Sequence, residues 1–263
     1  MARVRRRAPL FLAAIAAWIA LAPRVALAYR PFDGTDADVA ERGEFELELG
    51  PLGYFRLGDT NFLILPGAVL NYGILPRTEL VLQGFNYIQV GGLLTQPRDQ
   101  LLDTQLTAKV VLREGCLQDR PGVSIATEDG VLLPNVNGDV TVGATAAGIL
   151  SQCFSNLIVH YNAQVQLNLE HALELFGSVI LEGPRRWPVR PVAELYADTQ
   201  VGGRSSGSEA VGSVLQEATV YSGLLGAIWR VSANLDIDSA VRAASVGGLW
   251  NLEVRLGLTW RVR

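Results

Sequence analysis

The sequence predicts an all-β fold: a closed antiparallel transmembrane β-barrel of about twelve strands, with short periplasmic turns and longer extracellular loops. Three observations predict it. The N-terminus has the pattern of an export signal, the mean hydropathy is positive although no long apolar run follows that signal, and many segments alternate between apolar and polar residues. Apolar residues spread by alternation along an exported chain are typical of a barrel that meets lipid outside and encloses a polar lumen.

Residues 1–28 are predicted to be a signal peptide. A basic start with Arg3, Arg5, Arg6 and Arg7 precedes an apolar run over residues 10–22, and Ala26-Leu27-Ala28 fits a small-residue cleavage site. The run is shorter than the roughly 20 residues of a membrane-spanning helix, so we expect export and cleavage before Tyr29.

The charge of the exported chain argues against nucleic acid as a partner. The full sequence has 22 basic and 26 acidic residues, and five of the arginines lie in residues 1–28. The remaining chain therefore has 17 basic and 26 acidic residues, a net charge of −9. A nucleic-acid-binding surface would need a basic excess.

The last predicted strand, Trp250–Val262, gives the clearest evidence for a barrel. Its even positions are all apolar and include Trp250 and Trp260, ten residues apart. Its odd positions are polar, charged or glycine. Ten residues span roughly 33 Å along a strand, and with a tilt of about 40° they rise roughly 25 Å, the height of the lipid-facing band of a barrel. A long amphipathic strand of a periplasmic β-sandwich is the alternative.

The predicted elements before it divide the mature chain into two parts. Residues 29–43 are expected to be a solvated periplasmic lead-in, because Asp33, Asp36 and Asp38 lack the frame of a calcium-binding loop. Residues 44–263 are expected to form the barrel. Its strands are predicted at Glu44–Leu49, Phe62–Tyr72, Thr78–Val90, Leu102–Arg113, Val123–Leu133, Val140–Leu150, Asn156–Asn168, Ala172–Glu182, Val189–Gln200, Thr219–Val231, Leu235–Ala244 and Trp250–Val262.

The connections between these strands suit one topology. If the first strand runs outward, the short turns after Tyr72 and Val231 are periplasmic. The longer segments Gly91–Gln100 and Val201–Gln216 are then extracellular. An even strand number and this asymmetry are typical of bacterial outer-membrane barrels.

Several segments resemble one family. They are RPFDGTDADVAERGEFELELG at residues 30–50, LNYGILPRTELVLQGFNY at 70–87, PVAELYAD at 191–198, and GAIWRVSANLDIDSAVRAA with LEVRLGLTWRV at 226–262. Together they resemble the outer-membrane barrel proteins grouped with the MetA pathway of phenol degradation. The resemblance implies a barrel and the passage of small hydrophobic or aromatic molecules, and it assigns no functional residue.

The polar face of the predicted strands collects charges of both signs for the lumen. The candidates are Glu44, Glu46, Glu48, Lys109, Arg113, His160, Glu174, Glu182, Arg190, Glu194, Asp236, Asp238, Arg242, Glu253 and Arg255. Such charges could tune permeation through an open pore or form a core of ion pairs that plugs the barrel. Twelve strands lie between the filled and the open size ranges, so both alternatives stay open.

Two further groups of residues carry predictions. Tyr221, Trp229, Trp250 and Trp260 lie on the apolar faces and are expected to form aromatic girdles at the membrane interfaces. Cys116 and Cys153 both fall in predicted periplasmic turns, where the compartment is oxidising, so a disulfide between them is a hypothesis.

The sequence favours a pore or transporter of the Gram-negative outer membrane over an enzyme. No serine lies in a nucleophile elbow, and no His, Cys or Asp cluster has metal-ligand spacing, so no cofactor or metal is expected. The expected partners are outer-membrane lipid, the barrel assembly machinery and a small solute. A closed structural or adhesive barrel using Val201–Gln216 is the main alternative, and an outer-membrane lipid-modifying enzyme is a remote one.

Overall fold

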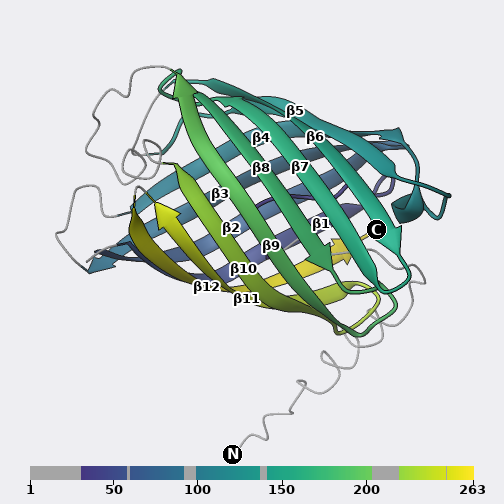
Figure 1. The fold of residues 1–263 in the computed structure, drawn as a ribbon. Helices are drawn as coiled ribbons and strands as arrows, with labels where there is room; N and C mark the ends of the chain where they lie inside the picture. The colour runs from purple at the N-terminus through teal and green to yellow at the C-terminus, as the bar shows by residue number, and fades with distance from the viewer. Residues whose placement is uncertain (1–30, 58–59, 92–98, 137–140, 203–218, 247) are drawn as a thin grey trace, which may run out of the picture.

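Twelve antiparallel strands close into one barrel in the computed structural model, which describes residues 31–57, 60–91, 99–136, 141–202, 219–246 and 248–263 (Figure 1). The strands are β1 Phe45–Leu57, β2 Thr60–Leu75, β3 Thr78–Gly91, β4 Asp99–Arg113, β5 Ser124–Leu132, β6 Gly143–Phe154, β7 Leu157–Leu167, β8 Leu173–Glu182, β9 Val189–Gly202, β10 Val220–Arg230, β11 Leu235–Val246 and β12 Leu249–Val262. The predicted fold class is therefore confirmed. The predicted signal peptide, residues 1–28, lies outside the described residues.

Each strand pairs with its neighbours in sequence, and β1 pairs with β12 to close the sheet. This seam runs from Phe45 opposite Val262 to Leu57 opposite Asn251. Closure leaves no strand edge unpaired, which is what a sheet surrounded by lipid requires. No helix among the described residues is long and apolar enough to cross a membrane.

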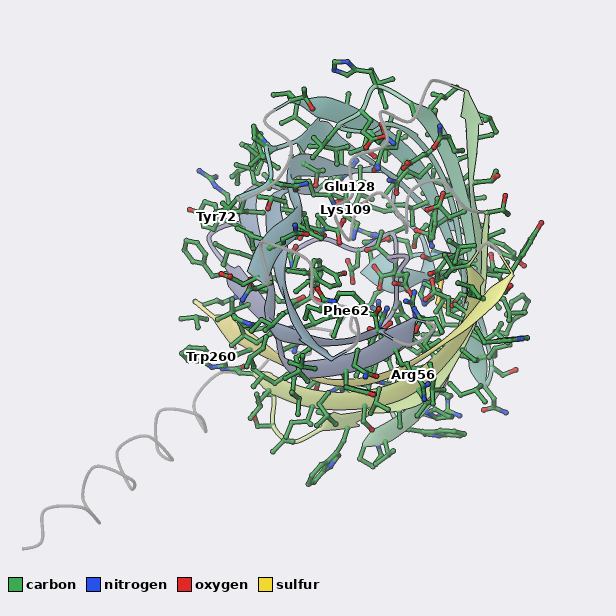
Figure 2. The ribbon with its side chains drawn as sticks, turned by 90° about the vertical axis from the view of Figure 1, so that its left-hand side faces the viewer. Arg56, Phe62, Tyr72, Lys109, Glu128 and Trp260 are labelled. Carbon is green, nitrogen blue, oxygen red and sulfur yellow. A yellow bond between two sulfur atoms is a disulfide. The ribbon has the colours of Figure 1, made fainter. Side chains whose placement is uncertain are left out.

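The two faces of the sheet differ in polarity, as the alternation requires. Apolar side chains such as Leu225 (71% exposed) and Trp250 (75%) point away from the barrel. Polar and charged side chains line the inside, where Figure 2 places Lys109 and Glu128, which lie opposite each other on the adjacent strands β4 and β5. The barrel is thus apolar outside and polar inside, the arrangement of a transmembrane barrel.

The outward aromatic residues form two levels. Tyr221 on β10 and Trp250 on β12 both lie opposite Ser245 of the intervening β11. Trp229 lies opposite Ile237, two residues along β11 from Leu235, which lies opposite Trp260. All four aromatic side chains are exposed. One pair therefore lies toward each end of the barrel.

We call the end where β1 begins and β12 ends the turn end, and the opposite end the loop end. The turn end has connections at residues 76–77, 114–123, 155–156, 183–188 and 231–234. The second of these contains a short 3-10 helix, η1 Cys116–Gln118, and is the longest at this end. The predicted extracellular loops lie mostly outside the described residues, which omit 92–98 and 203–218.

Two strands differ most from their predicted bounds. β1 continues to Leu57 instead of ending at Leu49, because a register shift between Leu49 and Leu52 absorbs the Gly50-Pro51 interruption. β6 begins at Gly143 and extends to Phe154, so Cys153 lies within a strand rather than in a turn. The small residues of this segment gave no alternation from which its ends could be located.

Candidate functional site: the barrel lumen

The lumen holds almost all the charged residues that the sequence assigned to it. Buried in the interior are Glu44, Glu46, Glu48, Lys109, His160, Glu174, Glu182, Arg190, Glu194, Asp236, Asp238 and Glu253, with Arg242 and Arg255 partly buried beside them. Arg113 differs from the prediction. It is exposed at the turn-end terminus of β4, because the pairing with β5 shifts between Val111 and Arg113 and alters the alternation there.

A belt of ion pairs crosses neighbouring strands near the turn end. Arg190 on β9 is fully buried between Glu182 on β8 (2.9 Å) and Asp236 on β11 (3.3 Å). Arg261 on β12 pairs with Glu46 on β1 across the seam and lies 3.6 Å from Asp236. Buried charges require such partners, so these ion pairs form a connected polar network along the inner wall near the turn end.

The segment predicted to be a periplasmic lead-in lies inside the barrel instead. We call residues 31–41 the lumenal segment. Its backbone N–H groups donate to side chains of four strands. Asp33 and Gly34 donate to Glu194 on β9 (both 2.8 Å), and Ala37 donates to Ser151 on β6 (3.0 Å). The expectation of a solvated lead-in is wrong, because inward-facing side chains supply the hydrogen bonds that water would otherwise supply.

Thr35 contacts the barrel wall through its N–H, its carbonyl and its hydroxyl. Its N–H donates to the Asn162 side-chain oxygen (3.1 Å), and its carbonyl accepts from the Asn162 side-chain nitrogen (2.9 Å). Lys109 donates to the Thr35 hydroxyl (3.0 Å). The Asn162 amide thus pairs with the backbone as a neighbouring strand would.

Gly34 brings the backbone of the lumenal segment close to the barrel wall. A Cβ atom at this position would lie 2.4 Å from the Ser178 hydroxyl and 2.8 Å from the Asn162 side-chain nitrogen. The backbone of the lumenal segment therefore packs directly against the barrel wall at this level.

At the cavity end, Asp33 connects the lumenal segment to two arginines of the wall. Arg255 donates to the Asp33 carboxylate at 2.8 Å and to the Pro31 carbonyl at 2.7 Å, and Arg242 lies 3.6 Å from the same carboxylate. Both arginines also pair with Glu253 at 2.7 Å. Asp33 is thus part of a four-member network of alternating charge.

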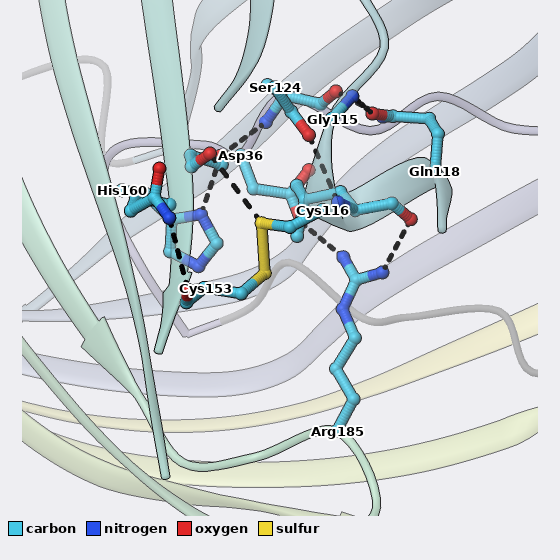
Figure 3. Close-up of a disulfide and its surroundings, with 12 residues drawn as sticks. Asp36, Gly115, Cys116, Gln118, Ser124, Cys153, His160 and Arg185 are labelled. Carbon is cyan, nitrogen blue, oxygen red and sulfur yellow. Dashed lines mark hydrogen bonds and ion pairs between the residues drawn. A yellow bond between two sulfur atoms is a disulfide. The ribbon is translucent and has the colours of Figure 1, made fainter. Parts of the chain in front are cut away.

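At the turn end, two connections between strands cover the lumenal segment (Figure 3). Arg185, from the β8–β9 connection, contacts Asp36 and Asp38 (both 3.3 Å) and the Leu117 carbonyl. Gln118 donates to the Ala37 carbonyl at 2.8 Å. Burial raises the pKa of the Asp36 carboxyl above its ordinary value, although Lys109 and Arg185 oppose the shift.

A disulfide joins Cys116, the first residue of η1, to Cys153 on β6, with Cα atoms 5.9 Å apart. It holds the 114–123 connection against the inner wall, where Leu117 packs with Ala37, Ala126 and Ile149. This apolar cluster and the disulfide together hold the turn end of the lumenal segment in place.

Ser151, His160 and Glu182 form a chain with the connectivity of a hydrolase triad. His160 Nδ1 lies 2.8 Å from the Ser151 hydroxyl, and its Nε2 lies 3.4 Å from Glu182. However, Ser151 is fully buried and its hydroxyl accepts the Ala37 N–H, so its surroundings leave no space for a substrate. In this structure these three side chains bind the lumenal segment through the Ser151 hydroxyl.

A cavity of about 470 Å³ occupies the lumen on the loop side of the lumenal segment. Residues 31–35 form one wall of it, and the inward faces of the strands form the rest. Its lining mixes aromatic rings, glutamines and charged groups, among them Tyr87, Phe176, Gln105 and Asp198. No group of three or more His, Cys, Asp or Glu among the described residues is arranged to hold a metal ion.

Comparison with known proteins supports the fold and no more. No protein-family model and no curated protein matches the chain. Among solved structures it is similar to the porin NanC, with a TM-score of 0.53 and 6% identity over 82% of this chain and 98% of that chain. Weaker matches include the porin KdgM (TM-score 0.48, 9% identity, 82% and 98%) and the monoaromatic hydrocarbon channel CymD (0.38, 7%, 84% and 88%). The chain is thus built like an outer-membrane β-barrel.

Proposed function

We propose that this protein is an outer-membrane pore for small solutes, closed at rest by the lumenal segment and opened when that segment moves. The observation that carries the proposal is a polar cavity inside a lipid-facing barrel, separated from the turn end by a segment bound through side-chain contacts. Because those contacts are noncovalent, the segment can leave without disturbing the strand pairing. The belt of wall ion pairs does not depend on it.

The solute proposed is small and carries an apolar or aromatic part. A volume of about 470 Å³ lies in the range of sites for small organic molecules. Phe85, Tyr87, Phe176 and Tyr196 line the cavity and offer surface to a ring. This agrees with the solute class implied by the resemblance to the proteins of the MetA pathway, and we propose that the chain belongs with them.

We also propose the location and the partners that such a barrel needs. The sequence begins with an export signal that we expect to be removed after Ala28. The apolar outer surface, with aromatic residues at both ends, suits the lipid of a Gram-negative outer membrane. Insertion there would use the barrel assembly machinery.

Conductance of the refolded protein in planar bilayers tests the proposal. We expect discrete steps from the unmodified barrel. In the double variant Gly34→Cys with Ser178→Cys, the two positions are close enough for a disulfide, so oxidation should lock the lumenal segment in place and abolish the steps. A reductant should restore them, with the unmodified protein plus reductant as the control for the native disulfide.

Two other results would contradict the proposed gating or the proposed pore. Steps that persist in the oxidised double variant would show that the lumenal segment is not the barrier. No steps from the unmodified barrel, the reduced variant or a variant lacking residues 31–41 would favour the closed structural or adhesive barrel. We propose transport rather than lipid modification, since Ser151 lies in the lumen and not at a lipid-facing rim.

A further inference from the structure

The cavity contains carboxylates that the wall does not neutralise. Asp103 on β4, Glu174 on β8 and Asp198 on β9 all line it. The two guanidinium groups that line it, Arg242 and Arg255, pair with Asp33 and Glu253. Among the described lining residues, no cationic side chain is therefore left for these three acids.

The hydrogen-bond partners of these acids are neutral. Asp103 accepts from the Tyr87 hydroxyl (3.2 Å), and Glu174 accepts from the side-chain amides of Gln166 (3.0 Å) and Asn168 (2.6 Å). Neutral donors satisfy individual oxygen atoms but leave the negative charge in place. Glu174 is buried, and a buried carboxylate without a counter-charge is costly, so this part of the cavity favours a cation.

A second observation at the same wall indicates a ligand. Thr145 on β6 lines the cavity and is only 8% exposed, yet its hydroxyl has no hydrogen-bond partner. It lies opposite Gln166 on β7, which in turn lies opposite Glu174 on β8, so the unpaired hydroxyl and the carboxylate lie at one level of the wall on either side of β7. A buried hydroxyl without a partner indicates a polar group that enters from the cavity.

Aromatic rings beside these acids select the kind of cation. Phe176 and Tyr196 line the cavity with ring centroids 5.3 Å apart, and Phe176 lies opposite Asp198 in the pairing of β8 with β9. Ring faces attract organic ammonium groups and also bind apolar carbon. A hydrated metal ion would make no use of such a surface.

We propose that the wall formed by Asp103, Thr145, Glu174, Phe176 and Asp198 binds a protonated amine that carries an apolar or aromatic group. The ammonium group would lie among the carboxylates and donate to Thr145, and the apolar group would contact Phe176. This inference rests on the proposed pore, because it names the class of solute for the same cavity.

Binding to the refolded mature protein in detergent, measured by calorimetry, tests the inference without requiring conductance. Benzylammonium is the probe, and benzyl alcohol and benzoate are controls with the same ring. We expect saturable binding of benzylammonium, at least tenfold tighter than that of either control. The double variant Glu174→Gln with Asp198→Asn should weaken it at least tenfold, and Thr145→Val about fivefold.

A matched control is Asp119→Asn, which neutralises an exposed acid beside η1 at the opposite end of the barrel and should leave binding unchanged. Heat-modifiable gel mobility verifies that each variant is folded. Equal binding of benzyl alcohol, no binding of benzylammonium, or unchanged binding in the folded double variant would overturn the inference. Binding without any conductance would uphold this site and reject the pore, whereas conductance without binding would do the reverse.

Discussion

Replacing Glu194 with glutamine should raise the fraction of time that the barrel conducts. Glu194 is almost fully buried and accepts the N–H groups of Asp33 and Gly34, both at 2.8 Å, through separate carboxylate oxygens. The amide of Glu194→Gln has only one oxygen, so one of these hydrogen bonds is lost and the other loses its charge.

The size of this effect follows from the two hydrogen bonds. A hydrogen bond to a charged group contributes about 1.5 to 3 kcal/mol, and a neutral one about 1. Losing one bond and weakening the other therefore costs the bound state of the lumenal segment about 2 to 5 kcal/mol. Since 1.4 kcal/mol corresponds to a factor of ten, the ratio of open to closed barrel should rise about 30- to 4,000-fold.

Single-channel recording in planar bilayers measures this ratio as open probability. Glu46→Gln is the matched control, because it makes the same change in the lumen at a residue whose ion pair is with Arg261 of the wall. It should leave the open probability unchanged. If folded Glu194→Gln protein shows the open probability of the unmodified barrel, the lumenal segment is not held by this carboxylate and the reasoning fails.

Three further outcomes can be measured. Replacing both Cys116 and Cys153 with serine should lower the free energy of unfolding, measured by urea titration, by about 4 kcal/mol, because the unfolded chain regains the entropy of a 37-residue loop. It should also raise the open probability. An unchanged titration midpoint would contradict this. Gly34→Val should raise the open probability, because the larger side chain collides with Ser178 and displaces the lumenal segment. Adding Ser178→Gly should partly reverse the effect. An open probability in the single variant equal to that of the unmodified barrel would show that the surrounding side chains accommodate the valine. Leu225→Arg, outward at the middle of β10, should cost about 2 to 4 kcal/mol of folding free energy in lipid vesicles, whereas a change below about 0.5 would mean that this face does not meet lipid.

Most of the fold could be predicted from the alternation of apolar and polar residues along the strands. The strict pattern of β12 gave the correct face for every residue from Trp250 to Glu253, since a period of two leaves no other arrangement once one face meets lipid. Strand ends were less predictable. β1 passes through Gly50-Pro51 by a change in register, and Arg113 follows another, and neither change has a signature in alternation alone.

The position of the lumenal segment could not be predicted from the sequence. Its residues are polar and small, which is equally typical of a solvated linker. Its partners are far away along the chain, 161 residues for Asp33 with Glu194 and 127 for Thr35 with Asn162. The one local signal is a set of acceptors, such as Glu194 and Asn162, on the polar faces of strands, and those faces are also what an open pore would need.

The contacts of the lumenal segment determine when it can take its place during biogenesis. Its docking site includes Arg255 on β12, which is 224 residues from Pro31, so the site is incomplete until the last strand has paired with the first. The lumenal segment is near the N-terminus and is synthesised early, but its docking site is complete only when β12 has paired with β1. On the proposed pore function, a barrel that has closed before its lumenal segment has docked would conduct.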